Sequence, residues 1–319
     1  MLRRIAAFSA LAVLALQAFA QPTYPSKPIR IVVPFPPGSA TDTITRILAA
    51  PVSAALGQPI VVDNKAGADG AIAAHEVAKA VPDGYTLLMA TNSPMSAVPA
   101  MRKVVPYDPL ADFTPITDVG RYTFFLFVHS AVPANSLAEL VGHAKANPGK
   151  LAYATGNTTG IVSFAQMKAL AGIDMVHVPY KGEPQGMTDL VGGRVQLMWA
   201  TPTTGLAHAK EGRLRPLVTS LRARSPLLPE VPTIYEAGMP QFSITSWAAL
   251  FGPARLARET VERLNREFRA AMQREDVRGQ MQKQAFQLTG SSPEELGAFV
   301  KEQLESYRNI LRAAGVQPE

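Results

Sequence analysis

The stretch that decides the fold runs from residue 29 to residue 56 and begins Ile29-Arg30-Ile31-Val32-Val33-Pro34-Phe35-Pro36-Pro37-Gly38-Ser39-Ala40-Thr41-Asp42. Its first part, residues 29–34, is a β-branched run typical of a buried strand. Small and polar residues follow, and apolar residues then recur every three or four positions over residues 41–56, which predicts a helix. A strand joined by a short loop to a helix is the unit of a parallel α/β sheet.

The same alternation continues outward from this stretch. In the first half we expect further strands at residues 60–63 and 85–90 and a helix at residues 70–81. After residues 106–109 the pattern restarts, with expected strands at 124–129, 151–154, 175–179, 195–200 and 215–219 and helices at 136–147, 160–171 and 185–191. A late strand at residues 247–252 and two closing helices, one at 258–273 and one starting at Ser292, complete the prediction.

No flexible linker separates the two halves, so we expect one chain that passes between two lobes. The crossings are placed near Tyr122–Phe124 and Ser246–Trp247. One lobe then comprises residues 24–122 and 247–319, and the other comprises residues 123–246. Such a bilobed α/β protein binds its ligand in the cleft, at the carboxyl ends of the strands.

A second loop, Thr155-Gly156-Asn157-Thr158-Thr159-Gly160, stands between a predicted strand and helix just as residues 34–42 do. Each loop delivers small hydroxyl or glycine residues to a helix N-terminus, where free N–H groups and the helix dipole favour an anion. Either loop alone is equally a good helix cap; two such loops, one per lobe, favour ligand binding. Asp42 is interpreted as a first-turn residue that complements the dipole, since its charge would repel an anion.

Composition and motifs exclude several classes of function. The net charge is +6, or +4 without Arg3 and Arg4, and the basic residues are scattered, which argues against nucleic-acid binding. The absence of Cys excludes disulfides and thiolate chemistry. The chain has no G-x-S-x-G, no phosphate-binding P-loop, no G-x-G-x-x-G and no zinc-type histidine pair. No catalytic residue, cofactor or metal is therefore expected.

The N-terminus predicts export. A basic start, an apolar run over residues 5–19 and Ala18-Phe19-Ala20 describe a secretory signal peptide, residues 1–20, cleaved after Ala20. The alternative is an N-terminal membrane anchor, but the run is shorter than the ~20 residues that a span needs. We expect the mature protein to be exported; if the source is Gram-negative, its location is the periplasm.

Several motifs occur in the order found in one family of proteins. They are Tyr24-Pro25-Ser26-Lys27-Pro28-Ile29-Arg30, residues 33–42, Pro82-Asp83-Gly84-Tyr85-Thr86-Leu87-Leu88, Pro106-Tyr107-Asp108-Pro109, Asn147-Pro148-Gly149-Lys150-Leu151, His177-Val178-Pro179-Tyr180-Lys181-Gly182 and Pro229-Glu230-Val231-Pro232-Thr233. With these motifs the chain resembles the tripartite tricarboxylate transporter receptors, the Bug-type extracytoplasmic solute-binding proteins. The resemblance covers essentially the whole expected mature chain.

The resemblance implies a type II-like, two-lobed periplasmic binding protein fold, with two parallel or mixed sheets flanked by helices. It implies capture of a small carboxylate in the cleft, often through bridging waters, and delivery to a two-component membrane permease by a receptor expected to be a monomer. The residues that match the family's ligand loops are Phe35, Gly38, Ser39, Ala40 and Thr41 in the first loop, and Thr155, Asn157, Thr158 and Thr159 in the second. Ser93, Tyr180 and Thr201 complete the expected ligand-binding set.

Residues 197–202 bear on which carboxylate is bound. Many members of the family that this chain resembles carry an acidic residue at the position of Ala200. In this chain the whole segment is uncharged. A buried ammonium without a partner is costly, so the segment predicts a preference for carboxylates without an amino group. Trp199 is either a wall of the cleft or a core residue.

Two other functions stay open at this point. One is a sensing receptor on the same fold, which presents its closed form to a signalling partner. The other is an α/β hydrolase, which would need a base within hydrogen-bond reach of Ser39 or Thr158.

Overall fold

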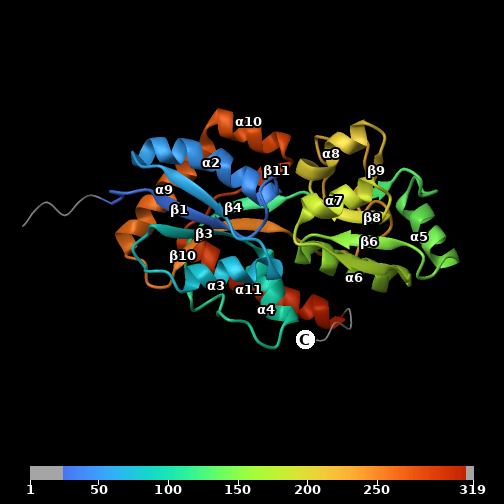
Figure 1. The fold of residues 1–319 in the computed structure, drawn as a ribbon, viewed down its shortest axis with the longest axis horizontal. Coiled ribbons are helices and arrows are strands. Elements are labelled where there is room, and N and C mark those ends of the chain that lie inside the picture. Colours follow the sequence, from blue (N-terminus) through green and yellow to red (C-terminus); the bar gives the residue numbers. More distant parts are fainter. Residues whose placement is uncertain (1–23, 314–319) are drawn as a thin grey trace, which may run out of the picture.

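The computed structural model describes residues 24–313 of the 319. The expected signal peptide lies outside the described residues. Two α/β units lie side by side along the long axis of the molecule, and the C-terminal helix runs beneath the first unit toward the second (Figure 1).

Strands and helices alternate through most of the chain. The elements are β1 (Ile29–Val33), α2 (Ala40–Leu56), β2 (Ile60–Asn64), η2 (Ala68–Gly70), α3 (Ala71–Ala78), β3 (Thr86–Thr91), η3 (Ser93–Ala97), α4 (Val98–Met101), β4 (Phe113–Tyr122), β5 (Phe125–His129), α5 (Leu137–Ala146), β6 (Ala152–Thr155), α6 (Thr158–Ala171), β7 (Val176–Pro179), α7 (Glu183–Val191), β8 (Leu197–Ala200), α8 (Pro202–Lys210), β9 (Leu214–Thr219), β10 (Trp247–Pro253), α9 (Arg258–Gln273), α10 (Glu275–Lys283), β11 (Phe286–Leu288) and α11 (Pro293–Ala313).

The first sheet has the strand order β11-β4-β10-β3-β1-β2. As the β-α-β pattern predicts, β1 is parallel to both β2 and β3, and Ile31 lies opposite Val62 on one side and Leu87 on the other. β10 is antiparallel to its neighbours β3 and β4, so the sheet is mixed. Helices α2 and α9 cover one face and α3 and α11 the other (Figure 1). Ile29 and Val33 are fully buried, because a strand covered on both faces is apolar on both.

The second sheet has the order β7-β6-β8-β5-β9. β6 is parallel to β7 and β8, whereas β5 is antiparallel to β8 and β9. Helix α6 lies on one face, and α7 and α8 lie on the other (Figure 1). The fold is therefore the two-sheet α/β architecture that the sequence predicts.

The chain passes between the two sheets at two places. β4 ends at Tyr122 in the first sheet and β5 begins at Phe125 in the second; the chain returns where β10 begins at Trp247. The two crossing segments are hydrogen-bonded to each other, with the Tyr122 N–H donating to the Ser246 carbonyl at 3.0 Å. A paired double crossing of this kind is suited to serve as a hinge.

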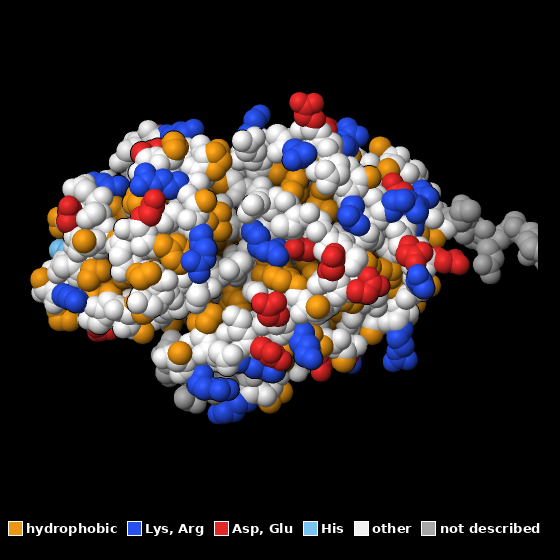
Figure 2. All heavy atoms as spheres, turned by 180° about the vertical axis from the view of Figure 1, so that it is seen from behind, with side chains coloured by type: hydrophobic (Ala, Val, Ile, Leu, Met, Phe, Trp, Pro, Cys, Tyr) orange, Lys and Arg blue, Asp and Glu red, His pale blue; other side chains and the backbone are white. Residues whose placement is uncertain are grey.

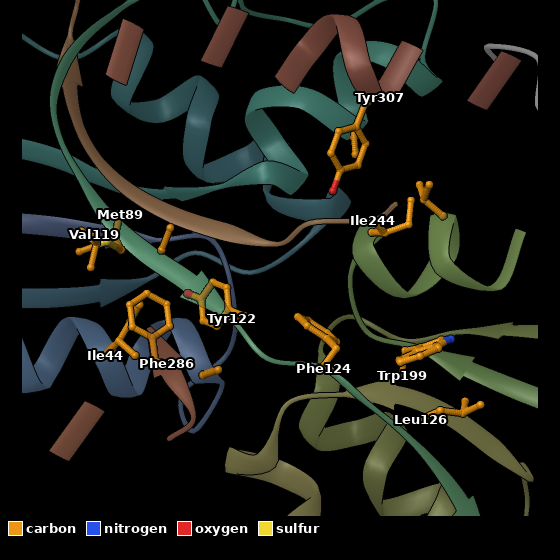
Figure 3. Packing of buried hydrophobic residues seen from close by; sticks show 14 of the residues in the cluster. Ile44, Met89, Val119, Tyr122, Phe124, Leu126, Trp199, Ile244, Phe286 and Tyr307 are labelled. Atoms are coloured by element: carbon orange, nitrogen blue, oxygen red, sulfur yellow. The ribbon is translucent and has the colours of Figure 1, made fainter. Parts of the chain in front are cut away.

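An apolar cluster extends along the molecule through the crossing. Ile44, Met89 and Val119 contribute to it from the first unit, and Leu126 and Trp199 from the second. Tyr122 and Phe124 lie between these two groups (Figure 3). The core is thus continuous from one sheet to the other.

Sequence periodicity missed β4, α8, α10 and β11, and also the short helical segments η3 and α4. β4 contains Pro115 and Gly120 and has two register irregularities against β10, which break the alternation expected of a strand. α8 contains Thr203, Thr204 and Gly205, which are weak helix formers. The sequence predicts two closing helices, whereas the structure has three. The additional helix, α10, follows α9 after a break at the extended residue Arg274.

Within the described residues we find no helix that is both long and apolar enough to cross a membrane.

Candidate functional site

Two helix N-termini, one from each lobe, meet at the same place. Ser39 caps α2, its hydroxyl accepting a hydrogen bond from the Asp42 N–H at 3.3 Å. Asn157 caps α6 in the same way, its side-chain oxygen accepting from the Gly160 N–H at 3.0 Å. Each cap satisfies the third N–H of its helix and leaves the first two N–H groups outside the helical hydrogen-bond pattern. The result is two positive helix ends that face each other across the cleft.

A small polar cavity of about 30 Å³ lies between these helix ends. It is lined by Phe35, Ser39, Ala40, Thr41, Thr91, Asn92, Ser93, Tyr122, Phe124, Gly156, Asn157, Thr159, Glu183, Thr201 and Ser246. Most of these side chains offer hydroxyl or amide groups, and both loops and both crossing segments contribute. The volume corresponds to one or two water molecules, so the lobes are closed on each other.

Hydrogen bonds between the lobes hold this closed form. The Thr158 hydroxyl donates to the Ser93 hydroxyl at 2.7 Å, and the Asn92 amide donates to the Thr159 hydroxyl at 2.8 Å. The Asn92 amide also donates to the Tyr307 hydroxyl at 2.8 Å, which ties α11 to the cleft. At the second crossing, the Ser246 hydroxyl donates to the Asn92 side-chain oxygen at 2.9 Å. Closure is therefore linked to the hinge through Asn92.

Glu183, the first residue of α7, brings a carboxylate to the cavity wall. It is 5% exposed, and its oxygens accept hydrogen bonds from Asn157, Thr201 and Thr204. All of these donors are neutral. Burial raises the pKa of Glu183, and the hydrogen bonds offset this rise only in part. Among the described residues that line the cavity, Glu183 is the one acidic or basic side chain.

Asp42 is the second buried carboxylate at a helix start, and it does not line the cavity. It accepts hydrogen bonds from the Gly38 N–H at 3.0 Å, from Arg46 at 2.9 Å and from the Asn64 amide at 3.1 Å. Although burial alone would raise its pKa, these bonds, led by that of Arg46, hold the pKa of Asp42 below its ordinary value. The interpretation of Asp42 as a first-turn structural residue agrees with these contacts.

The structure brings most of the sequence-predicted site residues together. Eight of the twelve line the cavity: Phe35, Ser39, Ala40, Thr41, Ser93, Asn157, Thr159 and Thr201. Four do not, namely Gly38, Thr155, Thr158 and Tyr180. The Thr158 hydroxyl is engaged by Ser93, as described above. Thr155 is hydrogen-bonded to the His177 ring at 2.7 Å, and the Tyr180 hydroxyl donates to Asp189 at 2.7 Å on the outer side of α7.

Sequence reasoning did not place Thr91, Asn92, Gly156 and Glu183 in the site. Glu183 carried a recognisable signal, because Lys181-Gly182-Glu183-Pro184 also joins a strand to a helix with Pro in the first turn. Tyr122, Phe124 and Ser246 were singled out as crossing residues but not as lining residues.

The structure decides between the two alternatives for Trp199 and adds a neighbour to residues 197–202 that the sequence did not reveal. Trp199 is fully buried and stacks on Phe242 with ring centroids 5.5 Å apart, so it is a core residue and no cleft wall. Residues 197–202 themselves carry no charge, but their surroundings include one. The neighbouring Thr201 donates both its N–H (3.1 Å) and its hydroxyl (2.7 Å) to Glu183, so a carboxylate from another element lies against this segment.

The outer surface differs from the cavity in its charge. On the face shown in Figure 2, Lys and Arg side chains are interspersed with Asp and Glu. This view shows no continuous basic patch of the kind that binds nucleic acid.

Two α/β units, a double crossing and a polar cavity at opposed helix N-termini define a two-lobed solute-binding protein. Comparison with known sequences gives the family. Residues 44–316 match the tripartite tricarboxylate transporter family receptor. The chain is 37% identical over 315 residues to a protein encoded in the tcbD-tcbE intergenic region of Pseudomonas sp. strain P51, with 97% of this chain and 93% of that protein covered. It is 33% identical to BugT of Bordetella pertussis, with 92% and 91% covered. The chain belongs to this receptor family, as its motifs predict.

Solved structures agree with the sequence comparison. Rpa4515 of R. palustris, solved with adipate, superposes with a TM-score of 0.89 at 31% identity, with 93% of this chain and all of that chain covered. MatC (Rpa3494) of Rhodopseudomonas palustris, solved with bound malate, gives a TM-score of 0.85 at 29% identity, with 90% of this chain and all of that chain covered. The fold expected from the resemblance is confirmed by these superpositions.

Proposed function

We propose that the protein captures a small carboxylate between its lobes in the periplasm and presents it to a two-component membrane permease. One observation carries this proposal: the N-termini of α2 and α6 come from opposite lobes and face one cavity. Helix N-termini bind carboxylates well, because their N–H groups and dipoles both favour negative charge. The adipate and malate of the two solved relatives belong to the same ligand class.

We propose that residues 24–122 with 247–319 form one moving lobe and residues 123–246 the other. The cavity of about 30 Å³ is smaller than a dicarboxylate, so the ligand enters an open form. The hinge is the hydrogen-bonded pair of crossings at Tyr122 and Ser246. The expected cleavage after Ala20 and the monomeric state are part of the same proposal.

The contacts of Ser39 and Thr158 favour binding over hydrolysis. The Ser39 hydroxyl is occupied by the Asp42 N–H, and the Thr158 hydroxyl donates to Ser93. Neither contact supplies the base that a hydrolase would need at these residues. A sensing receptor would close on its ligand in the same way. Uptake of the ligand into vesicles that contain the permease distinguishes transport from sensing, because only a transport receptor should stimulate uptake.

Isothermal titration calorimetry with a panel of mono- and dicarboxylates tests the ligand class. Mass spectrometry of small molecules released from the purified protein identifies the natural ligand. Saturable binding of at least one carboxylate is expected. Failure of every carboxylate to bind, with release of a neutral or cationic compound instead, would refute the proposal.

Closure is tested with Gly182→Ala. The added Cβ would lie 2.6 Å from the Pro36 side chain, which belongs to the opposite lobe. The Gly182 backbone is extended, so alanine itself is tolerated there. Small-angle scattering should show compaction on ligand binding in the wild type and less compaction in this variant. Gly142→Ala in α5, whose Cβ meets no atom within 4 Å, is the control. Equal compaction in all three proteins would contradict closure at this contact.

A further inference from the structure

The inference concerns the Glu183 carboxylate, and it rests on the proposed function of the cavity. Glu183 starts α7 at a point where Gly182 packs against Pro36 of the opposite lobe. Its side chain is buried and lines the cavity that both lobes share. A carboxylate in such a place needs compensation for the loss of water around its charge.

The hydrogen bonds to Glu183 are unevenly distributed over its two oxygens. Oε2 accepts three, from the Thr201 N–H at 3.1 Å, the Thr201 hydroxyl at 2.7 Å and the Thr204 hydroxyl at 3.1 Å. Oε1 accepts one, from the Asn157 amide at 2.9 Å. A carboxylate oxygen has two lone pairs, and the two on Oε2 are already shared among three donors. Oε1 therefore has the capacity for one more hydrogen-bond donor.

No charged side chain around Glu183 neutralises its charge; the N-termini of α6, α7 and α8 nearby contribute only partial positive charge. Its four hydrogen bonds come from uncharged groups, and among the described residues no Lys, Arg or His forms an ion pair with it. The cavity lining contains no basic side chain either. Asp42 shows the contrast, because Arg46 supplies the opposite charge there. Glu183 is thus an acceptor whose charge no basic side chain of the described residues balances.

A ligand can supply what is missing. A purely anionic ligand would bring a second negative charge into a small cavity beside Glu183, and like charges at such distances repel strongly. A ligand that carries both a carboxylate and an ammonium group avoids this. Its carboxylate fits the N-termini of α2 and α6, and its ammonium fits Oε1 of Glu183.

We propose that Glu183 is a specificity-determining residue that selects aminocarboxylates, with the ligand ammonium hydrogen-bonded to Glu183. The proposal reverses the expectation drawn from Ala200. The acidic partner is supplied by the start of α7, which contacts the segment around Ala200 through Thr201. A cation next to the carboxylate also opposes the rise in pKa that burial causes at Glu183.

The test is calorimetry at pH 7.5 on ligand sets that differ in a single substituent. Each set holds an acid, its hydroxy acid and its amino acid, for example succinate, malate and aspartate, or glutarate, 2-hydroxyglutarate and glutamate, with propionate, lactate and alanine for shorter chains. In the wild type, the amino acid of the best set is expected to bind at least about tenfold more tightly than the unsubstituted acid.

Glu183→Gln is expected to remove this preference. It should weaken binding of the amino acid by about tenfold or more and strengthen binding of the unsubstituted acid. Asp189→Asn, which changes a partly exposed carboxylate on the same helix outside the cavity, is the control and should leave the ratio unchanged. An unsubstituted acid that binds as tightly as its amino acid, or a ratio unaffected by Glu183→Gln, would overturn the proposal. A hydroxy acid that matches the amino acid would also overturn it, since Glu183 would then select a hydroxyl.

A wild-type measurement keeps the test independent of the variant's folding. Titrations in two buffers of different ionisation enthalpy count the protons taken up on binding. Binding of a dicarboxylate should take up protons, because Glu183 must be neutralised, whereas binding of the amino acid should not. The reverse result would refute the role of Glu183. If no acid in any set binds, the proposed function itself fails, which is a distinct outcome.

Discussion

Two buried carboxylates at helix starts, Asp42 in one lobe and Glu183 in the other, are similar in burial but differ in their surroundings. They are 4% and 5% exposed. Asp42 has a guanidinium partner in Arg46, whereas Glu183 has only neutral donors. The pKa of Asp42 is lowered and that of Glu183 is raised. The difference shows that burial alone does not set the pKa of a carboxylate; the presence or absence of a counter-charge decides its direction.

The largest effect is expected for Asp42→Ala, which should lower the free energy of unfolding by about 2–4 kcal/mol at pH 7. The change leaves the Gly38 N–H and the Asn64 amide without this acceptor. Chemical denaturation measures the loss. Glu262→Ala, which breaks an exposed pair with Arg258, is the control and should cost less than about 0.5 kcal/mol. A loss of stability no larger than that of the control would show that the Asp42 carboxylate does not stabilise the fold.

Thr201→Val should come next, with a loss of about 1.5–3 kcal/mol in the free energy of unfolding. Its hydroxyl donates to the buried charge of Glu183, and valine has nearly the same shape without the donor. Thr188→Val is the matched control on α7, because that hydroxyl donates to a carbonyl in an exposed setting. In the background of Glu183→Gln the loss should shrink, since the charge is gone. An undiminished loss there would show that Thr201 does not act through Glu183.

A change of pH is expected to have a smaller effect on stability, and the contributions of Glu183 and Asp42 should change in opposite directions as pH rises. The folded pKa of Glu183 lies above its unfolded value of 4.5, so wild type should lose stability relative to Glu183→Gln as pH rises from 4.5 through the folded pKa. The folded pKa of Asp42 lies below its unfolded value of 3.8, so the stability it adds is present above pH 3.8 and is lost as pH falls through the folded pKa. Thermal unfolding of Glu183→Gln and Asp42→Asn between pH 2.5 and 8 measures both slopes. Parallel slopes would refute the comparison.

The smallest effect is expected for Arg46→Met, at less than about 1 kcal/mol in the free energy of unfolding. The side chain of Arg46 is 52% exposed, so water compensates for much of the lost pair. The change leaves Asp42 with neutral donors only, as Glu183 has, and should raise the pKa of Asp42. A carboxyl titration followed by NMR measures that rise. A pKa of Asp42 that stays unchanged would mean that Arg46 is not the cause of its low value.

The fold was predictable wherever local pattern and packing agree. The β-branched run predicts β1, and Ser39 together with the apolar spacing that follows it predicts α2. The observed bounds of both elements agree with the predicted ones within a residue or two. β4 escaped prediction because its irregular pairing with β10 places residues by tertiary contact and not by alternation. The same holds for α8, whose N-cap residue Thr201 and helical residue Thr204 both donate hydrogen bonds to Glu183.

The part of the site that lies at helix N-termini was predictable, because small polar residues before a helix are typical of an anion-binding loop. Ser39 and Asn157 stand at such starts, and both line the cavity. Glu183 was not found, because in the sequence a polar turn around residues 181–184 is typical of an exposed loop. Its surroundings are built by Asn157, Thr201 and Thr204, which come from other parts of the chain and which no local pattern contains.

The positions of the two tryptophans have a practical consequence for optical measurements. The chain contains two, Trp199 on β8 and Trp247 at the start of β10, so each sheet carries one intrinsic fluorophore. Both are fully buried, and neither indole N–H has a hydrogen-bond partner among the described residues. Both should therefore emit at short wavelength.

Their neighbours make the two signals different. Trp199 stacks on Phe242 inside the second unit, away from the cavity. Trp247 directly follows the crossing residue Ser246, and its ring meets Phe299 of α11 at a centroid distance of 5.4 Å. With Trp199 replaced by Phe, the remaining emission arises beside the hinge. The unlabelled protein thus contains its own optical reporter of cleft motion.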